Sequence, residues 1–134
     1  MESRVHLIFD LDGTLCPIKD VTEEYAELVP NYDMVEKMRR YAKNGAKITI
    51  FTSRGMRTYG NDVAKIQAKV VPIIREWLKK WQIPCDDLIV GKPWAGENGL
   101  YIDDRTVRPD EFLEYDYDDL ARICESSSIK KEDL

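Results

Sequence analysis

The sequence predicts an α/β protein with a Rossmann-like, three-layer architecture around a mainly parallel β-sheet. Short apolar runs alternate with segments of helical periodicity, and the first run, residues 5–9, is typical of a strand buried on both faces of a parallel sheet. Polar side chains follow the end of each run, where open α/β sheets bind their ligands. We expect one domain over residues 1–125 and a polar tail over residues 126–134.

Four strands are expected from the β-rich and apolar runs. They span residues 5–9, Lys47–Thr52, residues 88–90 and residues 99–102. His6, in the first of them, is expected to be a packed core residue. Only the loop 91–98 separates the last two strands, whereas a parallel crossover usually needs about a dozen residues or more. Either these two strands are not neighbours in the sheet or the loop takes a compact, irregular path.

The helices are expected between these strands and after the last one. Asp33 is the expected N-cap of the first helix, which the Asn44-Gly45 pair ends. The region before Pro72 is expected to be irregular, and a helix should run from Pro72, a residue favoured in the first turn, to about Gln82. Two shorter helices are expected over residues 109–113 and 117–125.

Composition and charge limit the classes of function. The chain has 20 Lys and Arg against 25 Asp and Glu, a net charge of −5, which disfavours binding of nucleic acid through its phosphates. No apolar stretch approaches the roughly 20 residues that span a bilayer, and the N-terminus lacks a signal-peptide pattern. Cys16, Cys85 and Cys124 are widely spaced and form no CxxC pair, which favours a reducing compartment. We therefore expect a cytoplasmic protein without a membrane partner, in which Cys16 is a small buried residue and not a nucleophile.

The most informative motif is the run from Asp10 to Thr14, directly after the first apolar run. Carboxylates at positions i and i+2, here Asp10 and Asp12, leave a strand on the same side, and Gly13 allows a sharp turn after them. Two carboxylates this close repel each other unless a cation lies between them. The pair therefore indicates a metal ion, Mg²⁺ being the obvious one, and chemistry on a phosphate group.

Residues suited to phosphate chemistry also follow the other expected strands. They are Thr52, Ser53 and Arg54 after the second strand, Lys92 after the third, and Asp103 and Asp104 after the fourth. Because the carboxyl ends of parallel strands share one edge of the sheet, these segments should converge on one crevice. Carboxylates suit a metal ion, whereas hydroxyl and ammonium groups suit phosphoryl oxygens, so the sequence predicts a phosphate-binding site there.

The order of these motifs resembles the phosphatases of the haloacid dehalogenase superfamily. Their DxDxT motif is matched by residues 10–14, their Ser or Thr at a strand end by Thr52, their Lys by Lys92 and their acidic pair by residues 103–104. The runs TSRGM, GKPW, YIDDR and RPDEF are similar to a small family of capless bacterial enzymes named capsule biosynthesis phosphatases. The resemblance implies a core of the haloacid dehalogenase type, without a cap domain.

This resemblance also implies a hydrolase that cleaves phosphomonoesters with Mg²⁺. Asp10 would be the nucleophile that forms an aspartyl-phosphate, and Asp12 the general acid and then the general base. Thr52 and Lys92 would bind the phosphoryl oxygens. The Asp10 carboxylate, the Asp12 carbonyl and Asp103 would hold the metal. Asp104 would be either a direct ligand or a neighbour of one.

The resemblance implies a role in capsule or surface-polysaccharide biosynthesis, and the substrate that we expect there is a small sugar or polyol phosphate or a related metabolite. Gly13, Ser53, Arg54 and Trp94 are expected to contact it, with Arg54 reading an anionic or hydroxylated part of the leaving group. Since no cap is encoded, the loops 17–30, 54–61 and 93–98, or a second subunit in a homo-oligomer, would close the crevice.

Three other functions are weighed against this one. The open crevice and the Thr52-Ser53-Arg54 run would suit a phosphatase of polynucleotide or nucleotide ends, but the net charge and the lack of a basic-aromatic tract disfavour it. A receiver-type signalling domain carries its phosphorylated Asp after the third strand, where this chain has Gly91 and Lys92. A non-catalytic phosphate-binding domain is hard to reconcile with a complete set of motif residues.

Overall fold

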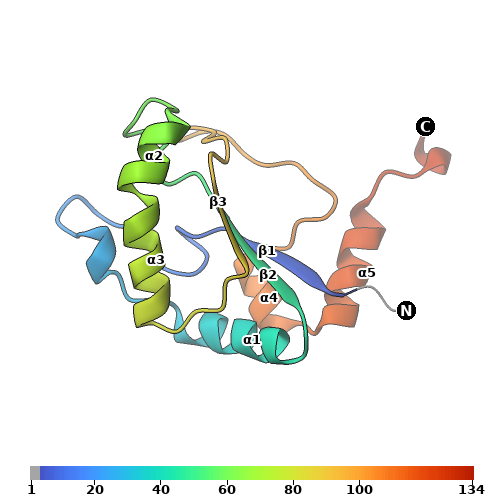
Figure 1. Cartoon of the computed structure of the whole chain (residues 1–134). Helices are drawn as coiled ribbons and strands as arrows, with labels where there is room; N and C mark the ends of the chain where they lie inside the picture. Colours follow the sequence, from blue (N-terminus) through green and yellow to red (C-terminus); the bar gives the residue numbers. More distant parts are fainter. Residues whose placement is uncertain (1–3) are drawn as a thin grey trace. The chain divides into compact units, whose positions relative to one another are not determined.

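The computed structural model describes residues 4–134, and the chain divides into two compact units, Met1–Trp94 and Ala95–Leu134 (Figure 1). The first unit contains a small parallel sheet with helices, and the second contains helices and loops. This mixed α/β architecture agrees with the predicted class and is compatible with a Rossmann-like fold. The single domain over residues 1–125 stays a prediction.

The sheet of the first unit has the order β1-β2-β3, and its neighbours are parallel. Its strands are β1 (His6–Phe9), β2 (Lys47–Thr52) and β3 (Asp87–Val90). The central strand β2 has the predicted bounds, and its residues Ile48, Thr49 and Ile50 are buried. The register pairs Phe9 with Ile50 and Thr52 with Val90, so the three strands end side by side. The residues that follow them therefore start from one edge of the sheet.

The prediction that the first strand is buried on both faces is wrong. Ile8 is 61% exposed, and within the described residues β1 pairs only with β2. An edge strand is covered less than a central one, which explains the difference. His6 is likewise exposed and not a core residue, although its Nε2 shares a hydrogen bond of 2.8 Å with Thr49 Oγ1.

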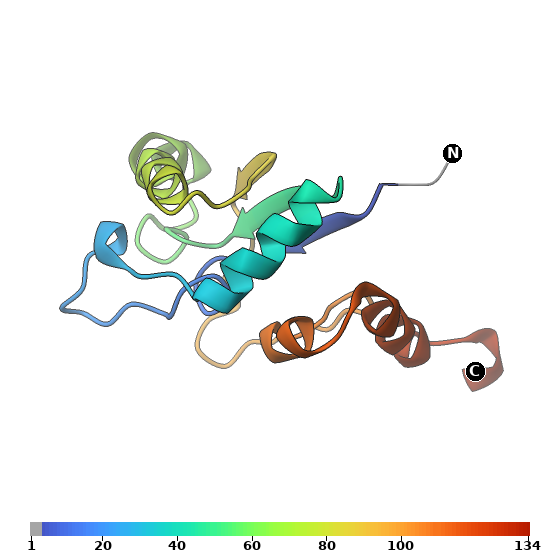
Figure 2. The same ribbon diagram turned by 90° about the horizontal axis from the view of Figure 1, so that it is seen from below.

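The helices of the first unit link these strands. α1 (Tyr32–Lys43) begins at Asn31, whose side chain accepts a hydrogen bond from the Met34 amide, so Asp33 lies within the first turn and is not the N-cap. The region before Pro72 forms a regular helix, α2 (Val63–Lys69), and is not irregular as expected. α3 (Val71–Lys80) has Pro72 in its first turn, as predicted, and continues almost along the axis of α2 (Figure 2).

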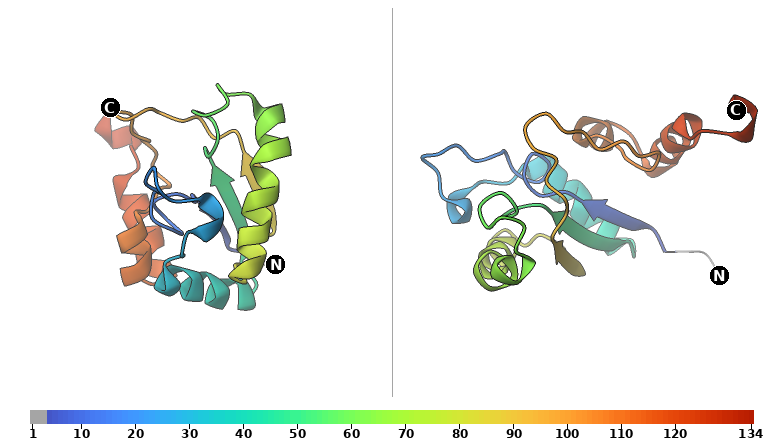
Figure 3. Two further views of the ribbon diagram at one scale, coloured as in Figure 1. Left: turned by 90° about the vertical axis from the view of Figure 1, so that its left-hand side faces the viewer. Right: turned by 90° about the horizontal axis from the view of Figure 1, so that it is seen from above.

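A short 3-10 turn, η1 (Tyr25–Glu27), packs beside α3 (Figure 3). The Trp77 indole of α3 donates a hydrogen bond of 2.6 Å to the Leu28 carbonyl, next to this turn. Ile66 of α2, Val71 of α3 and Val90 of β3 belong to a buried cluster with Met56. Leu28 belongs to the loop 17–30 and Met56 to the loop 54–61, so these contacts hold both loops in place.

The second unit contains α4 (Pro109–Glu114), α5 (Tyr117–Ser127) and the 3-10 turn η2 (Lys131–Asp133). Both helices lie close to their predicted ranges. The fourth strand predicted over residues 99–102 does not form, and Leu100 and Ile102 are 83% and 95% exposed. The short connection after β3 is consistent with this outcome. Within residues 4–134, no helix has both the length and the apolar character that a membrane crossing requires.

Candidate functional site

The Asp10–Thr14 run forms a tight turn directly after β1. Leu11 is fully buried, and its carbonyl accepts hydrogen bonds from the amides of Thr14 and Leu15 at 3.2 and 2.9 Å. Gly13 has a φ of +86°, which disfavours other residues, and its amide donates to the Cys16 carbonyl at 2.7 Å. With Leu11 anchored in the core, the turn holds the two neighbouring aspartates at the end of the strand.

Asp10 lies next to Lys92, which comes from the loop after β3. The Lys92 Nζ is 3.7 Å from Asp10 Oδ1, and both side chains are partly buried. The Lys92 amide donates to the Thr52 carbonyl at 3.2 Å, which ties the lysine loop to the end of β2. Burial raises the pKa of Asp10, against the lowering effect of the Lys92 charge. A carboxylate and an ammonium group are thus brought together from β1 and β3.

Asp12 is held by Arg54, which follows β2. Arg54 donates from Nε to Asp12 Oδ2 at 3.0 Å and from Nη2 to Asp12 Oδ1 at 2.7 Å. The Arg54 side chain is only 2% exposed, that of Asp12 is 24% exposed, and the guanidinium lies 4.0 Å from the centre of the Tyr25 ring. Such a two-fold hydrogen bond with a stacked aromatic ring fixes the direction of the carboxylate. Burial and the Asp12 charge raise the pKa of Tyr25, so its phenol stays protonated at neutral pH.

Thr52 and Ser53 shape the loop that carries Arg54. Thr52 is 1% exposed, and its Oγ1 accepts a hydrogen bond of 3.0 Å from the Arg54 amide. The half-buried Ser53 accepts a hydrogen bond of 3.0 Å from the Met56 amide at its carbonyl. The hydroxyl of Thr52 therefore orients the backbone that places the guanidinium on Asp12.

Cys16 lies beside the site but is poorly suited to attack a substrate. It is 3% exposed, and its Sγ is 3.8 Å from Asp12 Oδ1. Burial is the main cause that raises the pKa of its thiol to about 11, so the unreactive thiol form predominates at neutral pH. This agrees with the prediction of a small buried residue.

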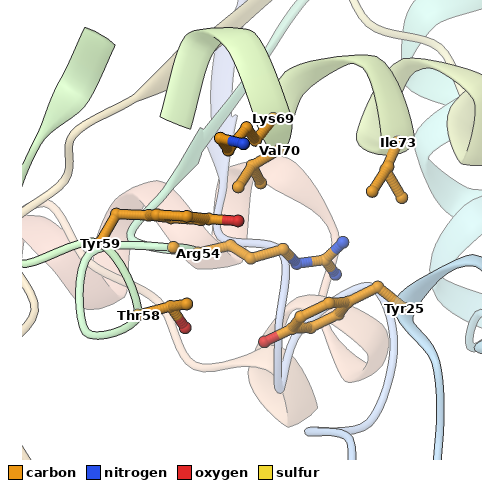
Figure 4. A pocket seen from close by; sticks show the side chains of 8 residues that line it. Tyr25, Arg54, Thr58, Tyr59, Lys69, Val70 and Ile73 are labelled. Atoms are coloured by element: carbon orange, nitrogen blue, oxygen red, sulfur yellow. The ribbon is translucent and has the colours of Figure 1, made fainter. Parts of the chain in front are cut away.

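A cavity of about 120 Å³ opens beside Arg54 (Figure 4). It is lined by Tyr25, Arg54, Gly55, Thr58, Tyr59, Lys69, Val70 and Ile73. In the view of Figure 4, the Tyr25 and Tyr59 rings lie on either side of the Arg54 side chain. Tyr25 and Lys69 belong to no motif that sequence reasoning could have identified. Tyr25 lies in the loop 17–30 and Lys69 lies at the end of α2, and the structure brings both to this cavity.

Three other residues predicted for the site lie outside these contacts. Trp94 is 44% exposed and does not line the cavity, but its ring is 5.3 Å from the Arg57 guanidinium. Asp103 and Asp104 are exposed in the second unit, where Asp103 Oδ1 accepts a hydrogen bond from the Arg105 amide at 2.8 Å. Within the described part of the first unit, no three His, Cys, Asp or Glu side chains form a metal-ligand cluster. A metal role for Asp103 and Asp104 stays a prediction.

Comparisons with known proteins identify one relative of known structure. No protein-family model matches the chain, and no curated protein matches it. A crystal structure of a structural-genomics target from Vibrio cholerae is similar to this chain, with a TM-score of 0.87 and 44% sequence identity. The similarity covers 92% of this chain and 99% of that chain. The chain therefore belongs to the same protein family as the Vibrio cholerae protein.

Proposed function

We propose that this chain is a Mg²⁺-dependent phosphomonoester hydrolase, a capless member of the haloacid dehalogenase superfamily related to the capsule biosynthesis phosphatases. One observation carries the proposal: Asp10, Thr52 and Lys92 gather where three neighbouring parallel strands end. A carboxylate, a hydroxyl and an ammonium group at this edge are what transfer of a phosphoryl group to an aspartate requires. The order of the sequence motifs supports the same assignment.

In the proposed reaction the two aspartates have different roles. A carboxylate oxygen of Asp10 attacks phosphorus, the bond to the leaving oxygen breaks, and Asp12 gives its proton to that oxygen. Water then attacks the phosphorus of the aspartyl-phosphate, Asp12 takes a proton from the water, and the bond to Asp10 breaks. Lys92 and Thr52 bind the phosphoryl oxygens, where negative charge must be stabilised.

The residues at this edge fit a magnesium ion by their chemistry. The Asp10 carboxylate and the Asp12 main-chain carbonyl offer hard oxygen ligands, and the Asp12 carboxylate is already bound to Arg54. In this proposal Asp103 adds another carboxylate. When bound, Mg²⁺ would neutralise charge on the phosphoryl group and orient it towards Asp10.

The substrate class proposed is a small sugar or polyol phosphate, hydrolysed in the cytoplasm. A screen of sugar, polyol and nucleotide monophosphates, with and without Mg²⁺, tests the proposal, with Asp10→Asn as the control variant. We expect Mg²⁺-dependent release of phosphate that Asp10→Asn abolishes. Absence of hydrolysis for every compound, or full activity of Asp10→Asn, would contradict the proposal. Preferred hydrolysis of nucleotides would favour the alternative of an end-processing phosphatase.

A further inference from the structure

The cavity beside Arg54 lies next to the residue that would protonate the leaving group. Arg54 both lines the cavity and holds the Asp12 carboxylate at 2.7 and 3.0 Å. In the proposed reaction Asp12 faces the oxygen that leaves phosphorus. Arg54 therefore links the proposed acid and base to the cavity.

The lining of the cavity offers hydrogen-bond donors, a positive charge and an apolar wall. Tyr25, Thr58 and Tyr59 carry hydroxyl groups, and Lys69 carries an ammonium group. No acidic side chain lines the cavity, and the Arg54 charge is offset by Asp12. Lys69, in the last turn of α2, thus supplies the uncompensated positive charge of the lining.

The volume limits what the cavity can enclose. A cavity of roughly 150 Å³ holds one benzene molecule. At about 120 Å³, this cavity has room for a short carbon chain of about five or six non-hydrogen atoms. A nucleoside, with its base and ribose, is much larger than this space. Size therefore favours a small metabolite as the occupant.

We propose that the cavity binds the leaving group of the substrate, and that this leaving group is a short hydroxylated carbon chain with a carboxylate. The assignment rests on the proposed phosphatase function. Lys69 binds the carboxylate, and the hydroxyls of Tyr25, Thr58 and Tyr59 bind the hydroxyl groups of the chain. Its C–H groups pack on Ile73 and Val70. This narrows the proposed small sugar or polyol phosphate to one whose carbon chain carries a carboxylate, a phosphorylated hydroxy acid.

Two commercially available phosphomonoesters test the carboxylate directly. 3-Phosphoglycerate carries a carboxylate where glycerol 3-phosphate carries a hydroxymethyl group, and kcat/KM is measured for both, with phenyl phosphate as the reference. We expect the wild type to prefer 3-phosphoglycerate by about tenfold, mainly through KM, as for a charge-assisted hydrogen bond. Lys69→Gln should remove this preference. Lys79→Gln, which changes an exposed lysine of α3, should keep it.

Binding of glycerate, the bare leaving group, gives a second measurement that needs no turnover. Saturation-transfer NMR should detect glycerate on the wild type and on Lys79→Gln, with a much weaker signal on Lys69→Gln. If phenyl phosphate is hydrolysed but the wild type has the same kcat/KM for 3-phosphoglycerate and glycerol 3-phosphate, the assignment of the cavity is wrong. The phosphatase function then stands. If no phosphomonoester is hydrolysed, the phosphatase function is wrong, whereas glycerate binding that depends on Lys69 would still support the cavity as a hydroxy-acid site.

Discussion

Arg54 and Asp12 form a two-fold hydrogen-bonded ion pair that joins the loop after β2 to the loop after β1. The Arg54 side chain is buried and that of Asp12 is partly buried, and the Tyr25 ring stacks on the guanidinium. The role expected for Arg54 from the sequence, contact with the leaving group, stays a prediction. Its position gives it a second role, because it fixes the direction of the proposed acid and base.

Replacement of Arg54 tests this positioning role. Arg54→Ala leaves the Asp12 carboxylate without its two hydrogen bonds, so we expect kcat for alkyl phosphates to fall by about 10²-fold, as is typical for the loss of acid-base catalysis. Aryl phosphates need less proton donation and should lose much less. Arg54→Lys, which keeps the charge but not the two-fold geometry, should lie in between. Equal losses for alkyl and aryl phosphates across these variants would rule out the role.

Lys92 is predicted to act on the phosphoryl group next to Asp10. Lys92→Met removes the charge 3.7 Å from Asp10 Oδ1 and should lower kcat by about 10²-fold for alkyl and aryl phosphates alike. The matched control is Lys47→Met, because Lys47 forms an ion pair of 3.1 Å with Asp87 where β2 and β3 begin, at the other end of both strands. Steady-state kinetics should show wild-type rates for this control. Similar losses in both variants would mean that Lys92 supports only the fold.

The metal dependence can be measured without a variant. Incubation with EDTA should abolish hydrolysis, and Mg²⁺ should restore it, because the proposed ligands are all oxygen atoms. Circular dichroism should show the same folded spectrum before and after chelation, since the core of the first unit is apolar and forms without these ligands. Full activity in EDTA would exclude an essential metal.

Cys16 is predicted to be inert despite its contact with Asp12. It is 3% exposed, whereas Cys85 is only half-buried. At neutral pH, iodoacetamide should therefore modify Cys85 well before Cys16, as read by peptide mass spectrometry. Cys16→Ala should keep kcat within a few-fold of the wild type. Rapid alkylation of Cys16 with loss of activity would contradict its assignment as a buried packing residue.

Much of the fold could be predicted from local patterns. β2 and the Pro72 helix have strong local signals, namely a run of β-branched residues and a proline that opens a helix. Residues 99–102 are also largely apolar but form no strand, because strand formation depends on a partner that no local pattern specifies. The N-cap of α1 was misplaced by two residues, since both Asn31 and Asp33 are good capping residues.

The proximity of Asp10 and Lys92 could be predicted because both residues follow strand ends. Parallel strands end at one edge of the sheet, so Lys92 lies next to Asp10 and its amide donates to the Thr52 carbonyl. The pairing of Arg54 with Asp12 joins residues that lie far apart in the sequence, and an arginine after a strand could equally have faced a ligand. The residues Tyr25 and Lys69 line one cavity because η1 packs against α3 and α2 packs against α3, which depends on the tertiary structure.

The most direct test of the central claim is to trap the phosphoryl group on Asp10. Borohydride reduces an aspartyl-phosphate to homoserine, so the enzyme is mixed with Mg²⁺ and a phosphomonoester, quenched with borohydride and digested for mass spectrometry. The account predicts homoserine at position 10, only when substrate is present. A substrate that is turned over without homoserine at position 10, or with the modification at another residue, would contradict it.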